Sequence, residues 1–321
     1  MLNGDRFVIV GRAGMDFYPD PPGTRTEDGA TWISALGGSA ANTAVQIVKL
    51  GGRADIVTCV SDDAVGRYVC NRLDHYGVGR AHVRAAGGEA RTSLAIVETT
   101  IEDHQSVIYR NGAADFEMNV ADVEAVDWDG YDAMITAGTV FAAEPSRTAA
   151  FRALELAREA GMPTFFDIDY RPYSWPSAAE ASGVLSRAGT MADVIVGNDV
   201  EFGFMAGDYE AGLDKAHCLI GAGAGVVIYK MGEKGAVTIT GAGAERSGIW
   251  RVDALKPTGA GDSFMGGFVS ALAQGREIAE AVARGSACAA ITVTRPTCSA
   301  ALPDTGELDR FMADHPGPTE D

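Results

Sequence analysis

A glycine-rich segment at residues 256–268 places one carboxylate beside a run of small residues. It reads Lys-Pro-Thr-Gly-Ala-Gly-Asp-Ser-Phe-Met-Gly-Gly-Phe, so Asp262 directly follows Gly259, Ala260 and Gly261. Small residues leave backbone N–H groups open at a helix start, where the amides and the helix dipole attract phosphate groups. A carboxylate held there could take a proton from a hydroxyl that attacks a phosphate. The segment therefore indicates phosphoryl transfer, although a tight strand-to-helix connection could have the same composition.

The overall charge limits the partners of this chain. Its 321 residues include 26 Lys and Arg against 44 Asp and Glu, a formal net charge of −18. That charge disfavours nucleic acid and anionic membranes, so an anionic substrate would need a locally basic pocket. Phe7–Val10 is too short for the apolar part of a signal peptide, and no apolar run approaches the roughly 18 residues that span a bilayer. We therefore expect a cytoplasmic protein that binds a small molecule, with no nucleic-acid or membrane partner.

The cysteines and histidines form no recognisable site. The cysteines are odd in number, widely spaced and without a CxxC pair, which favours free thiols over disulfides or a zinc centre. They are Cys59, Cys70, Cys218, Cys288 and Cys298. The five histidines are equally dispersed, so we expect no metal ion bound by histidine.

Short apolar runs alternate with amphipathic stretches along most of the chain. This rhythm predicts an α/β fold with a central, mostly parallel sheet flanked by helices. The apolar runs favour strands that are buried on both faces. Strands are expected at Phe7–Val10, Ala54–Val60, Ala133–Ala137, Thr164–Ile168, Val194–Val196 and Val226–Tyr229. Helices are expected at Ala40–Leu50, Ala64–Tyr76, Pro145–Ala160, Gly261–Gln274 and Ile278–Thr294.

Two segments interrupt this rhythm, at about residues 12–36 and 90–111. Both contain alternating or β-branched stretches with no helix between them. We expect one domain over residues 1–321, from which these segments project as a small β-sheet. Above the carboxyl edge of a parallel sheet, such a structure could be a lid that excludes water during phosphoryl transfer. The alternative is an ordinary antiparallel edge.

Other glycine-rich runs are poor matches to nucleotide-binding motifs. No Gly-Lys-Ser or Gly-Lys-Thr triplet occurs, which excludes the usual P-loop. Val8–Asp16 contains spaced glycines, but a proline-rich stretch follows it where a dinucleotide-binding motif needs a helix. The glycines at 221–225 precede a strand instead of following one. A Rossmann dehydrogenase is therefore disfavoured.

Four ordered motifs resemble those of the ribokinase-like (PfkB) carbohydrate kinases. Gly37–Ala44 with Lys49–Gly52, and Pro257–Asp262, resemble the two signatures of that family. Between them, Asn198–Glu201 is similar to its NxxE motif, and Val227–Ala236 to its nucleotide-site strand and turn. The resemblance implies a mostly parallel sheet with a β-lid, and it allows for a homodimer formed through that lid.

The resemblance also implies roles at an ATP site. Asp262 would be the general base, and the amides of Gly259, Ala260 and Gly261 would form the anion hole, which suits a reaction governed by positioning and charge stabilisation. Asn198 and Glu201 would order Mg²⁺ through water molecules, because Mg²⁺ keeps much of its hydration shell. Without the resemblance, these two residues would be an ordinary strand end and helix start. The other residues implied at the nucleotide are Lys230, Gly232 and Gly235.

On the sugar side, four positions match residues that bind substrate hydroxyls in the family. They are Asp16, Gly37, Gly38 and Asn42. A glycine pair lets a hydroxylated ligand approach the backbone, and short carboxylate and amide side chains exchange hydrogen bonds with it. Taken alone, Asp16 would be better explained as an acidic turn residue before Pro19, and the resemblance to the family reverses that preference.

The stretch Phe166–Trp175 indicates an acidic substrate. It places Asp169 and Arg171 at the carboxyl end of a buried strand, where open α/β sheets bind ligands. Arg171 could bind a carboxylate with two N–H groups, and Arg110 on the predicted lid could supply a second cation. The alternatives are a surface salt bridge for Arg110 and an aromatic-packed loop for Arg171.

Within the family, this stretch and Val10–Pro19 are similar to the kinases of 5-dehydro-2-deoxygluconate in inositol catabolism. That similarity implies ATP-dependent phosphorylation of the primary C6 hydroxyl of a keto-deoxy acid sugar. The 2-keto-3-deoxygluconate kinases are the nearest alternative, followed by fructokinase-like, ribokinase-like and nucleoside kinases. A non-catalytic sugar-binding protein is disfavoured, because the carboxylate and the anion hole are intact.

One position departs from the family pattern. Many members carry an aspartate six residues before the general base, where it helps to hold a monovalent cation, whereas this chain has Lys256. We hypothesise that the Lys256 ammonium replaces the ion, so that no monovalent cation is required.

Overall fold

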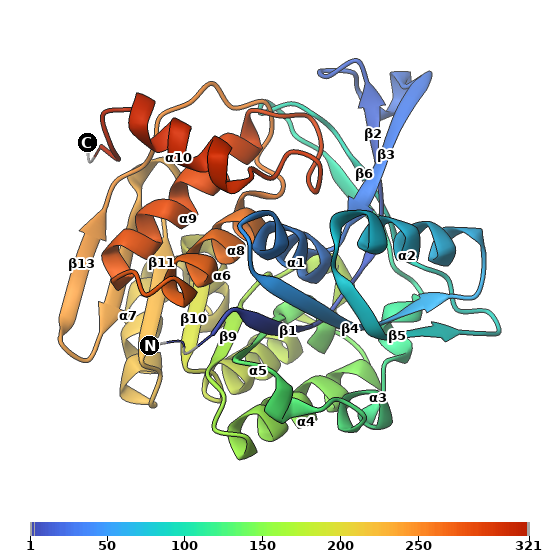
Figure 1. Ribbon diagram of the computed structural model, residues 1–321, viewed down its shortest axis with the longest axis horizontal. Helices are drawn as coiled ribbons and strands as arrows, with labels where there is room; N and C mark the ends of the chain where they lie inside the picture. The colour runs from blue at the N-terminus through green and yellow to red at the C-terminus, as the bar shows by residue number, and fades with distance from the viewer. Residues whose placement is uncertain (1, 3, 320–321) are drawn as a thin grey trace.

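A nine-stranded sheet forms the centre of the molecule (Figure 1). The computed structural model describes residue 2 and residues 4–319. Seven strands run parallel, and β12 and β13 continue the sheet in antiparallel fashion at one edge. In spatial order the strands are β13 (Gly243–Ser247), β12 (Ala236–Thr240), β11 (Val226–Lys230), β10 (Val194–Asn198), β9 (Thr164–Asp167), β8 (Ala133–Ala137), β1 (Arg6–Val10), β4 (Arg53–Ser61) and β5 (Gly79–Ala86).

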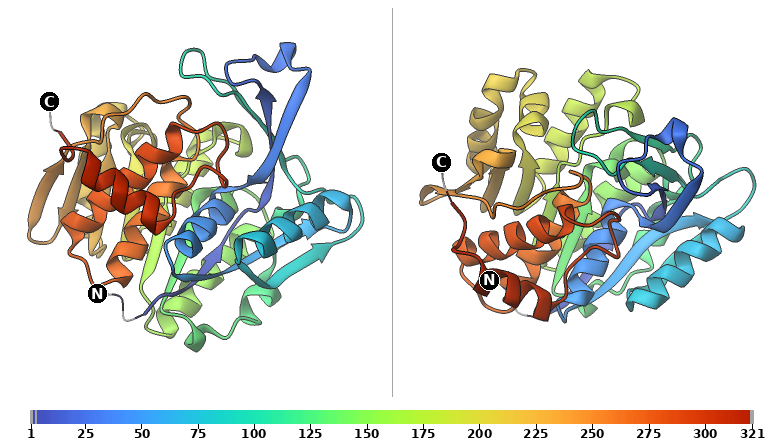
Figure 2. Two further views of the ribbon diagram at one scale, coloured as in Figure 1. Left: turned by 45° about the horizontal axis from the view of Figure 1, so that its top comes forward. Right: turned by 90° about the horizontal axis from the view of Figure 1, so that it is seen from above.

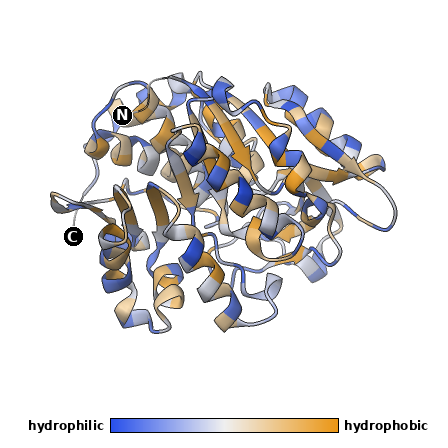
Figure 3. Cartoon of the chain, turned by 90° about the horizontal axis from the view of Figure 1, so that it is seen from below, coloured by the Kyte–Doolittle hydropathy of each residue, from blue (hydrophilic) through white to orange (hydrophobic). Residues whose placement is uncertain are grey.

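Alternation along the strands divides the interior into two cores. Val8 and Val10 of β1 face one core, and Phe7 and Ile9 face the other, because successive side chains point to opposite faces. The central strands are therefore apolar on both sides (Figure 3). The first core is covered by α3 (Val120–Glu124), α4 (Ser146–Glu159), α5 (Ala178–Gly189), α6 (Asp199–Ala206) and α7 (Gly212–Gly221). The second is covered by α1 (Ser39–Lys49), α2 (Ala64–Tyr76), α8 (Ala260–Ala273) and α9 (Ile278–Val293), with α10 (Thr305–Asp314) outside α9.

The predicted fold class is confirmed, and all six predicted strands are present within two residues of their expected ends. Strands β5, β12 and β13 were not predicted. They lie at or next to the sheet edges, where one face can stay polar, as the exposed β13 shows. Helices α3, α5, α6, α7 and α10 were also missed. None of the helices in the described residues is long and apolar enough to cross a membrane.

A second, four-stranded sheet projects from the main body (Figures 1 and 2). We call it the small sheet. Its order is β3 (Thr31–Gly37), β2 (Gly14–Asp20), β6 (Leu94–Val97) and β7 (Ser106–Tyr109). Because β2 begins four residues after the end of β1, the small sheet stands at the carboxyl edge of the main sheet.

Helices α1, α8 and α9 pack together in front of the main sheet (Figure 1). Ser263 of α8 donates a hydrogen bond from Oγ to Gln46 Oε1 of α1 (2.9 Å), and its Oγ lies 2.8 Å from Thr292 Oγ1 of α9. Gly266 and Gly267 allow this close approach, because a Cβ at either position would meet α1 or α9 within 2.8 Å. The start of α8, which carries the Gly-Ala-Gly-Asp motif, is thus fixed by its neighbours.

Candidate active site

A cavity of about 950 Å³ lies at the carboxyl ends of the parallel strands. It brings together residues from both halves of the sequence, as expected where parallel strands end at one edge. The predicted site residues in its wall are Asp16, Gly38, Asn42, Arg110, Asp169, Arg171, Asn198, Glu201, Lys230, Gly232, Gly235, Gly259, Ala260, Gly261 and Asp262. Gly37 is not in the wall but lies behind it, where a Cβ would collide with the carboxylate of Asp16.

Asp262 lies in the first turn of α8. The N-cap Gly259 has φ +86°, and a Cβ there would approach Cys298 Sγ to 2.9 Å, so the turn requires glycine. No side chain caps this helix, which leaves its first N–H groups directed at the cavity. Asn42 of α1 donates a hydrogen bond from Nδ2 to Asp262 Oδ2 (2.8 Å). Burial, reinforced by the charge of Asp169, raises the pKa of Asp262 to about 7.

Three further carboxylates line the cavity with Asp262, and they belong to Asp167, Asp169 and Glu201. Asp167 and Glu201 are buried, and burial is the main cause of their raised pKa values. The Asp167 charge adds to the effect on Glu201, whose pKa is about 7, and Lys230 opposes it. Asp169 has φ +35°, a strained backbone conformation for a residue with a side chain, and its Oδ1 lies 2.7 Å from Arg171 Nη2. These three carboxylates concentrate negative charge, which is suited to binding a cation.

Asn198 and Glu201 form the capping box of α6. Asn198 Oδ1 accepts a hydrogen bond from the Glu201 N–H (2.9 Å), and Glu201 Oε2 accepts one from the Asn198 N–H (2.8 Å). The NxxE spacing is therefore explained by the helix start, because a capping box needs residues three apart. Both side chains line the cavity beside Asp167, so the donor set also fits a hydrated Mg²⁺.

The sugar-side residues carry polar atoms that lack partners. Asp16 Oδ2 accepts a hydrogen bond from the Tyr18 hydroxyl (3.3 Å), but Asp16 Oδ1 and Asn42 Oδ1 are buried with no hydrogen-bond partner. Buried polar atoms are normally paired, so these two oxygens can accept hydrogen bonds from a ligand. Gly38 has φ +98°, and a Cβ there would collide with the carbonyl oxygen of Arg12.

Both arginines that were expected to bind a carboxylate already have acidic partners. Arg110 is buried, forms an ion pair with Asp115 and donates a hydrogen bond from Nη1 to the Thr139 carbonyl (2.7 Å). Its guanidinium also stacks 4.0 Å from the centre of the Phe116 ring. Arg171 is paired with Asp169, as described above, and its side chain is 44% exposed. The structure thus brings both to the cavity without leaving either charge free.

Several residues in the wall were not identified from the sequence. Arg12 directly follows Gly11 after β1, and the similarity of the stretch Val10–Pro19 to the family gave Arg12 no role of its own. Asp167 stands at the end of β9 inside the stretch that drew attention to Asp169. His104, between β6 and β7, places Nε2 within 3.0 Å of Thr258 Oγ1. This contact joins the small sheet to the residue before the Gly259 turn.

Lys256 is fully buried at the junction of the two sheets. Its Nζ donates a hydrogen bond to the Thr258 carbonyl (2.5 Å). Burial lowers its pKa, while the charges of Cys298, Asp262 and Asp16 oppose that effect. The Lys256 side chain is therefore near enough to Asp16 and to Asp262 to interact electrostatically with both.

Comparison with known proteins agrees with this arrangement. The family model for pfkB family carbohydrate kinases matches residues 5–305. The 5-dehydro-2-deoxygluconokinase of Photobacterium profundum is 36% identical over 313 residues, which cover 95% of this chain and 94% of that protein. 5-Dehydro-2-deoxygluconokinase 1 of Bacillus cereus is 34% identical over 311 residues, with the same coverage.

Solved structures share the fold of this chain. A double mutant of fructokinase from Vibrio cholerae, in its fructose-, ADP- and potassium-bound form, has a TM-score of 0.86 at 25% identity and covers 97% of this chain and 99% of its own. A ribokinase-fold protein of Escherichia coli in complex with ATP and Mg²⁺ has a TM-score of 0.85 at 20% identity, covering 97% and 100%. The cavity, its glycine turn and its carboxylates therefore sit in a chain that belongs to the pfkB family of carbohydrate kinases.

Proposed function

We propose that this chain transfers the γ-phosphate of ATP to the C6 hydroxyl of 5-dehydro-2-deoxy-D-gluconate. The observation that carries the proposal is the position of Asp262, which is oriented by Asn42 and lies beside the uncapped N–H groups of α8. The substrate is proposed from the relatives that bear its name and from the polar lining of the cavity.

In this reaction Asp262 accepts the proton of the C6 hydroxyl as the hydroxyl oxygen attacks the γ-phosphorus, and ADP leaves as the bond from that phosphorus to the bridging oxygen breaks. The amides of Gly259, Ala260 and Gly261 donate hydrogen bonds to the phosphate oxygens, where negative charge must be stabilised. Mg²⁺, when bound through water at Asn198 and Glu201, would neutralise phosphate charge. The nucleotide lies along the β11 side of the cavity, which includes Lys230, Gly232 and Gly235.

The sugar lies between Asp262 and the small sheet. The unpaired oxygens of Asp16 and Asn42 accept hydrogen bonds from its hydroxyls, and Gly37 and Gly38 let it approach the backbone. Asp169, Arg110 and Arg171 line the same part of the cavity, and the N–H groups that the two arginines have not committed to protein partners can reach an acidic sugar.

The test is ADP release with MgATP against five compounds: 5-dehydro-2-deoxygluconate, 2-keto-3-deoxygluconate, fructose, ribose and adenosine. We expect selective turnover of the first, and Asp262→Asn should lower kcat by about 10²- to 10⁴-fold while sparing sugar binding. Preference for 2-keto-3-deoxygluconate or a neutral compound would overturn the substrate. Near-normal kcat in the variant would overturn the base, and inactivity on all five would overturn the enzymatic proposal.

We also propose that Lys256 makes a monovalent cation unnecessary. Its buried ammonium, bonded to the Thr258 carbonyl, supplies a fixed positive charge next to the Gly259 turn. Turnover should therefore be the same in potassium, sodium or tetramethylammonium chloride at equal ionic strength. A steep activation by K⁺ in the wild-type protein would refute this role.

We propose that the small sheet, formed within residues 12–36 and 90–111 of a single domain, is both a lid and a dimer contact. Its strands alternate, so that Asp16 and Tyr18 are buried toward the cavity while Val107 and Tyr109 are exposed on the outer face. The other large apolar residues on the outer face are Met15, Phe17, Trp32, Leu94 and Ile96. A continuous group of large apolar side chains on an outer face favours contact with a partner, here a second copy of this chain.

Light scattering after size-exclusion chromatography tests the dimer. We expect a dimer that Val107→Asp converts to a monomer, and a monomeric wild-type protein would refute this contact. We further propose a cytoplasmic location, because five free cysteines suit a reducing compartment and the proposed co-substrate is ATP.

A further inference from the structure

We propose that Arg12 binds the carboxylate of the acidic sugar and thereby selects acids over neutral sugars at this site. This inference rests on the proposed function, which supplies the acidic substrate. It assigns to Arg12 a role that neither family signature nor the NxxE segment indicates, although Arg12 lies within Val10–Pro19, the stretch that resembles the 5-dehydro-2-deoxygluconate kinases.

The position of Arg12 is fixed by the protein. It follows β1 at the carboxyl edge of the sheet, and its Nε donates a hydrogen bond to Ser93 Oγ (2.7 Å), next to β6 of the small sheet. Its side chain is only 7% exposed, and it lines the cavity. The guanidinium is therefore held between the two sheets, with little freedom to turn into solvent.

Arg12 has an unsatisfied buried donor. Its Nη2 makes no hydrogen bond in the structure. Nη2 forms an ion pair with Asp16 Oδ1, but that oxygen is 3.8 Å away, which is too far for a hydrogen bond. That oxygen is itself without a hydrogen-bond partner. A buried guanidinium N–H without an acceptor is costly, so a ligand that supplies an acceptor there gains the full benefit of pairing.

Two other arginines of the cavity wall, Arg110 and Arg171, differ in this respect. Arg110 has a buried carboxylate in direct contact, and Arg171 has a carboxylate oxygen at 2.7 Å. Burial lowers the pKa of Arg110, and the nearby charge of Arg12 adds to that effect. Burial raises the pKa of Asp16, and the charge of Arg12 opposes that effect. Among these arginines, Arg12 carries the least compensated positive charge.

The location favours the sugar acid over a phosphate of ATP as the ligand. The glycine turn and Lys230 belong to α8 and β11, whereas Arg12 shares its wall with Asp16 and contacts Ser93. In the proposed substrate the carboxylate and the C6 hydroxyl are at opposite ends of the molecule. Arg12 lies on a different wall from Asp262. When the C6 hydroxyl is at Asp262, Arg12 is therefore in the right part of the cavity to bind the carboxylate at the other end of the sugar.

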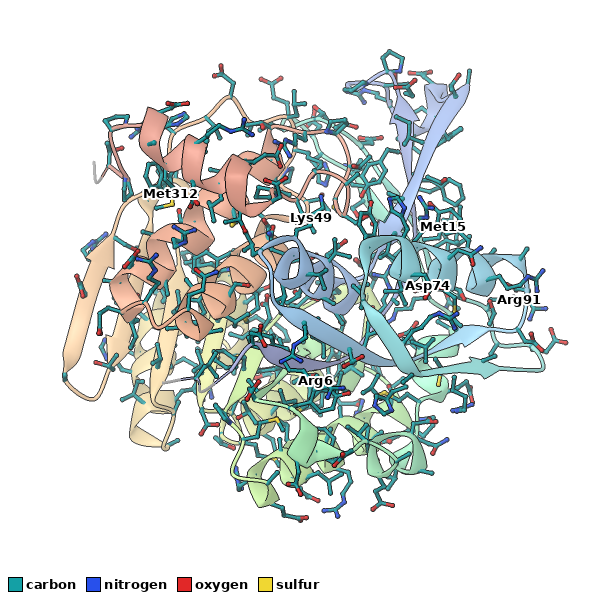
Figure 4. The ribbon with its side chains drawn as sticks, viewed as in Figure 1. Arg6, Met15, Lys49, Asp74, Arg91 and Met312 are labelled. Atoms are coloured by element: carbon teal, nitrogen blue, oxygen red, sulfur yellow. The ribbon has the colours of Figure 1, made fainter. Side chains whose placement is uncertain are left out.

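Gluconate and glucitol provide a matched pair of probes, because they differ only in a carboxylate against a hydroxymethyl group. Their dissociation constants would be measured by isothermal titration calorimetry for the wild-type protein, Arg12→Gln, Arg12→Lys, Ser93→Ala and Arg91→Gln. Arg91 is an exposed arginine at the outer end of the molecule, outside the cavity wall (Figure 4), so Arg91→Gln controls for the loss of one charge. Thermal unfolding would confirm that each variant is folded.

We expect Arg12→Gln to weaken gluconate by about 10- to 100-fold and glucitol by much less, with the KM for ATP unchanged. Arg12→Lys should discriminate between gluconate and glucitol better than Arg12→Gln does. Ser93→Ala should lose part of the wild-type discrimination, and Arg91→Gln should lose none. Equal weakening of both probes, or unchanged discrimination in Arg12→Gln, would overturn the inference. If the wild-type protein does not phosphorylate the keto acid but still prefers gluconate in an Arg12-dependent way, the proposed function fails and this site stands.

Discussion

Replacing Asp262 with asparagine should stabilise the folded protein while it removes activity. The carboxylate has a pKa of about 7 in the fold against an ordinary value of 3.8, mainly because it is buried. A carboxyl group whose pKa is raised by folding lowers stability as pH rises from the unfolded to the folded value. The substituted amide side chain would carry no charge, and its oxygen could still accept the hydrogen bond from Asn42.

The size of the effect follows from the two pKa values. One pKa unit corresponds to about 1.4 kcal/mol, so ionising Asp262 costs the fold about 4 kcal/mol at pH 8 and about 2 kcal/mol at pH 5. The stability gained by Asp262→Asn should therefore grow by about 2–3 kcal/mol between these pH values. The change is confined to pH 4 to 7 and levels off at about pH 8.

Urea unfolding at pH 5 and pH 8, without nucleotide, measures both free energies directly. Asp129→Asn is the matched control, because Asp129 is exposed and precedes β8 at the amino edge of the sheet, opposite the cavity. It should change stability little at either pH. A gain in Asp262→Asn that is the same at both pH values, or no gain at pH 8, would refute the electrostatic reasoning.

Three further outcomes are expected. The kcat/KM of the wild-type protein should rise with pH through about 7, as Asp262 ionises, and a profile that is flat from pH 5.5 to 8 would contradict this. Gly38→Ala should cost about 1–3 kcal/mol in urea unfolding and raise the sugar KM, because of its positive φ and the Arg12 carbonyl. Asn198→Ala should cost about 1 kcal/mol and raise the Mg²⁺ concentration needed for half-maximal activity. The equivalent change at Asn119, which caps α3, should have the same stability cost without the Mg²⁺ effect.

The parts of the site that depend on adjacent residues could be predicted from the sequence. The Gly259 turn and Asp262 are contiguous, so composition alone indicates a helix start with a carboxylate in its first turn. The central strands could be predicted for a similar reason, because burial on both faces leaves few polar residues in them. The edge strand β13 could not, since its exposed residues have no such constraint.

Pairings between distant residues could not be predicted. Arg110 was expected to be a free cation, but the chain folds back so that Asp115 meets it. Arg12 contacts Ser93, which is 81 residues away, and nothing in either local sequence indicates that contact. Pattern analysis finds the residues that bring charge to a cavity, but the three-dimensional structure decides which of those charges a neighbour has already neutralised.

The hydrogen bonds from Gln46 through Ser263 to Thr292 join three helices without involving the small sheet. Residues that hold the reacting carboxylate are therefore inherited as one packed unit, whereas residues that face the sugar come partly from the separate strands of the small sheet. During evolution, substitutions in the small sheet can change which sugar is accepted without disturbing that unit. This separation gives a physical reason why one family can diversify its substrates while keeping a single transfer chemistry.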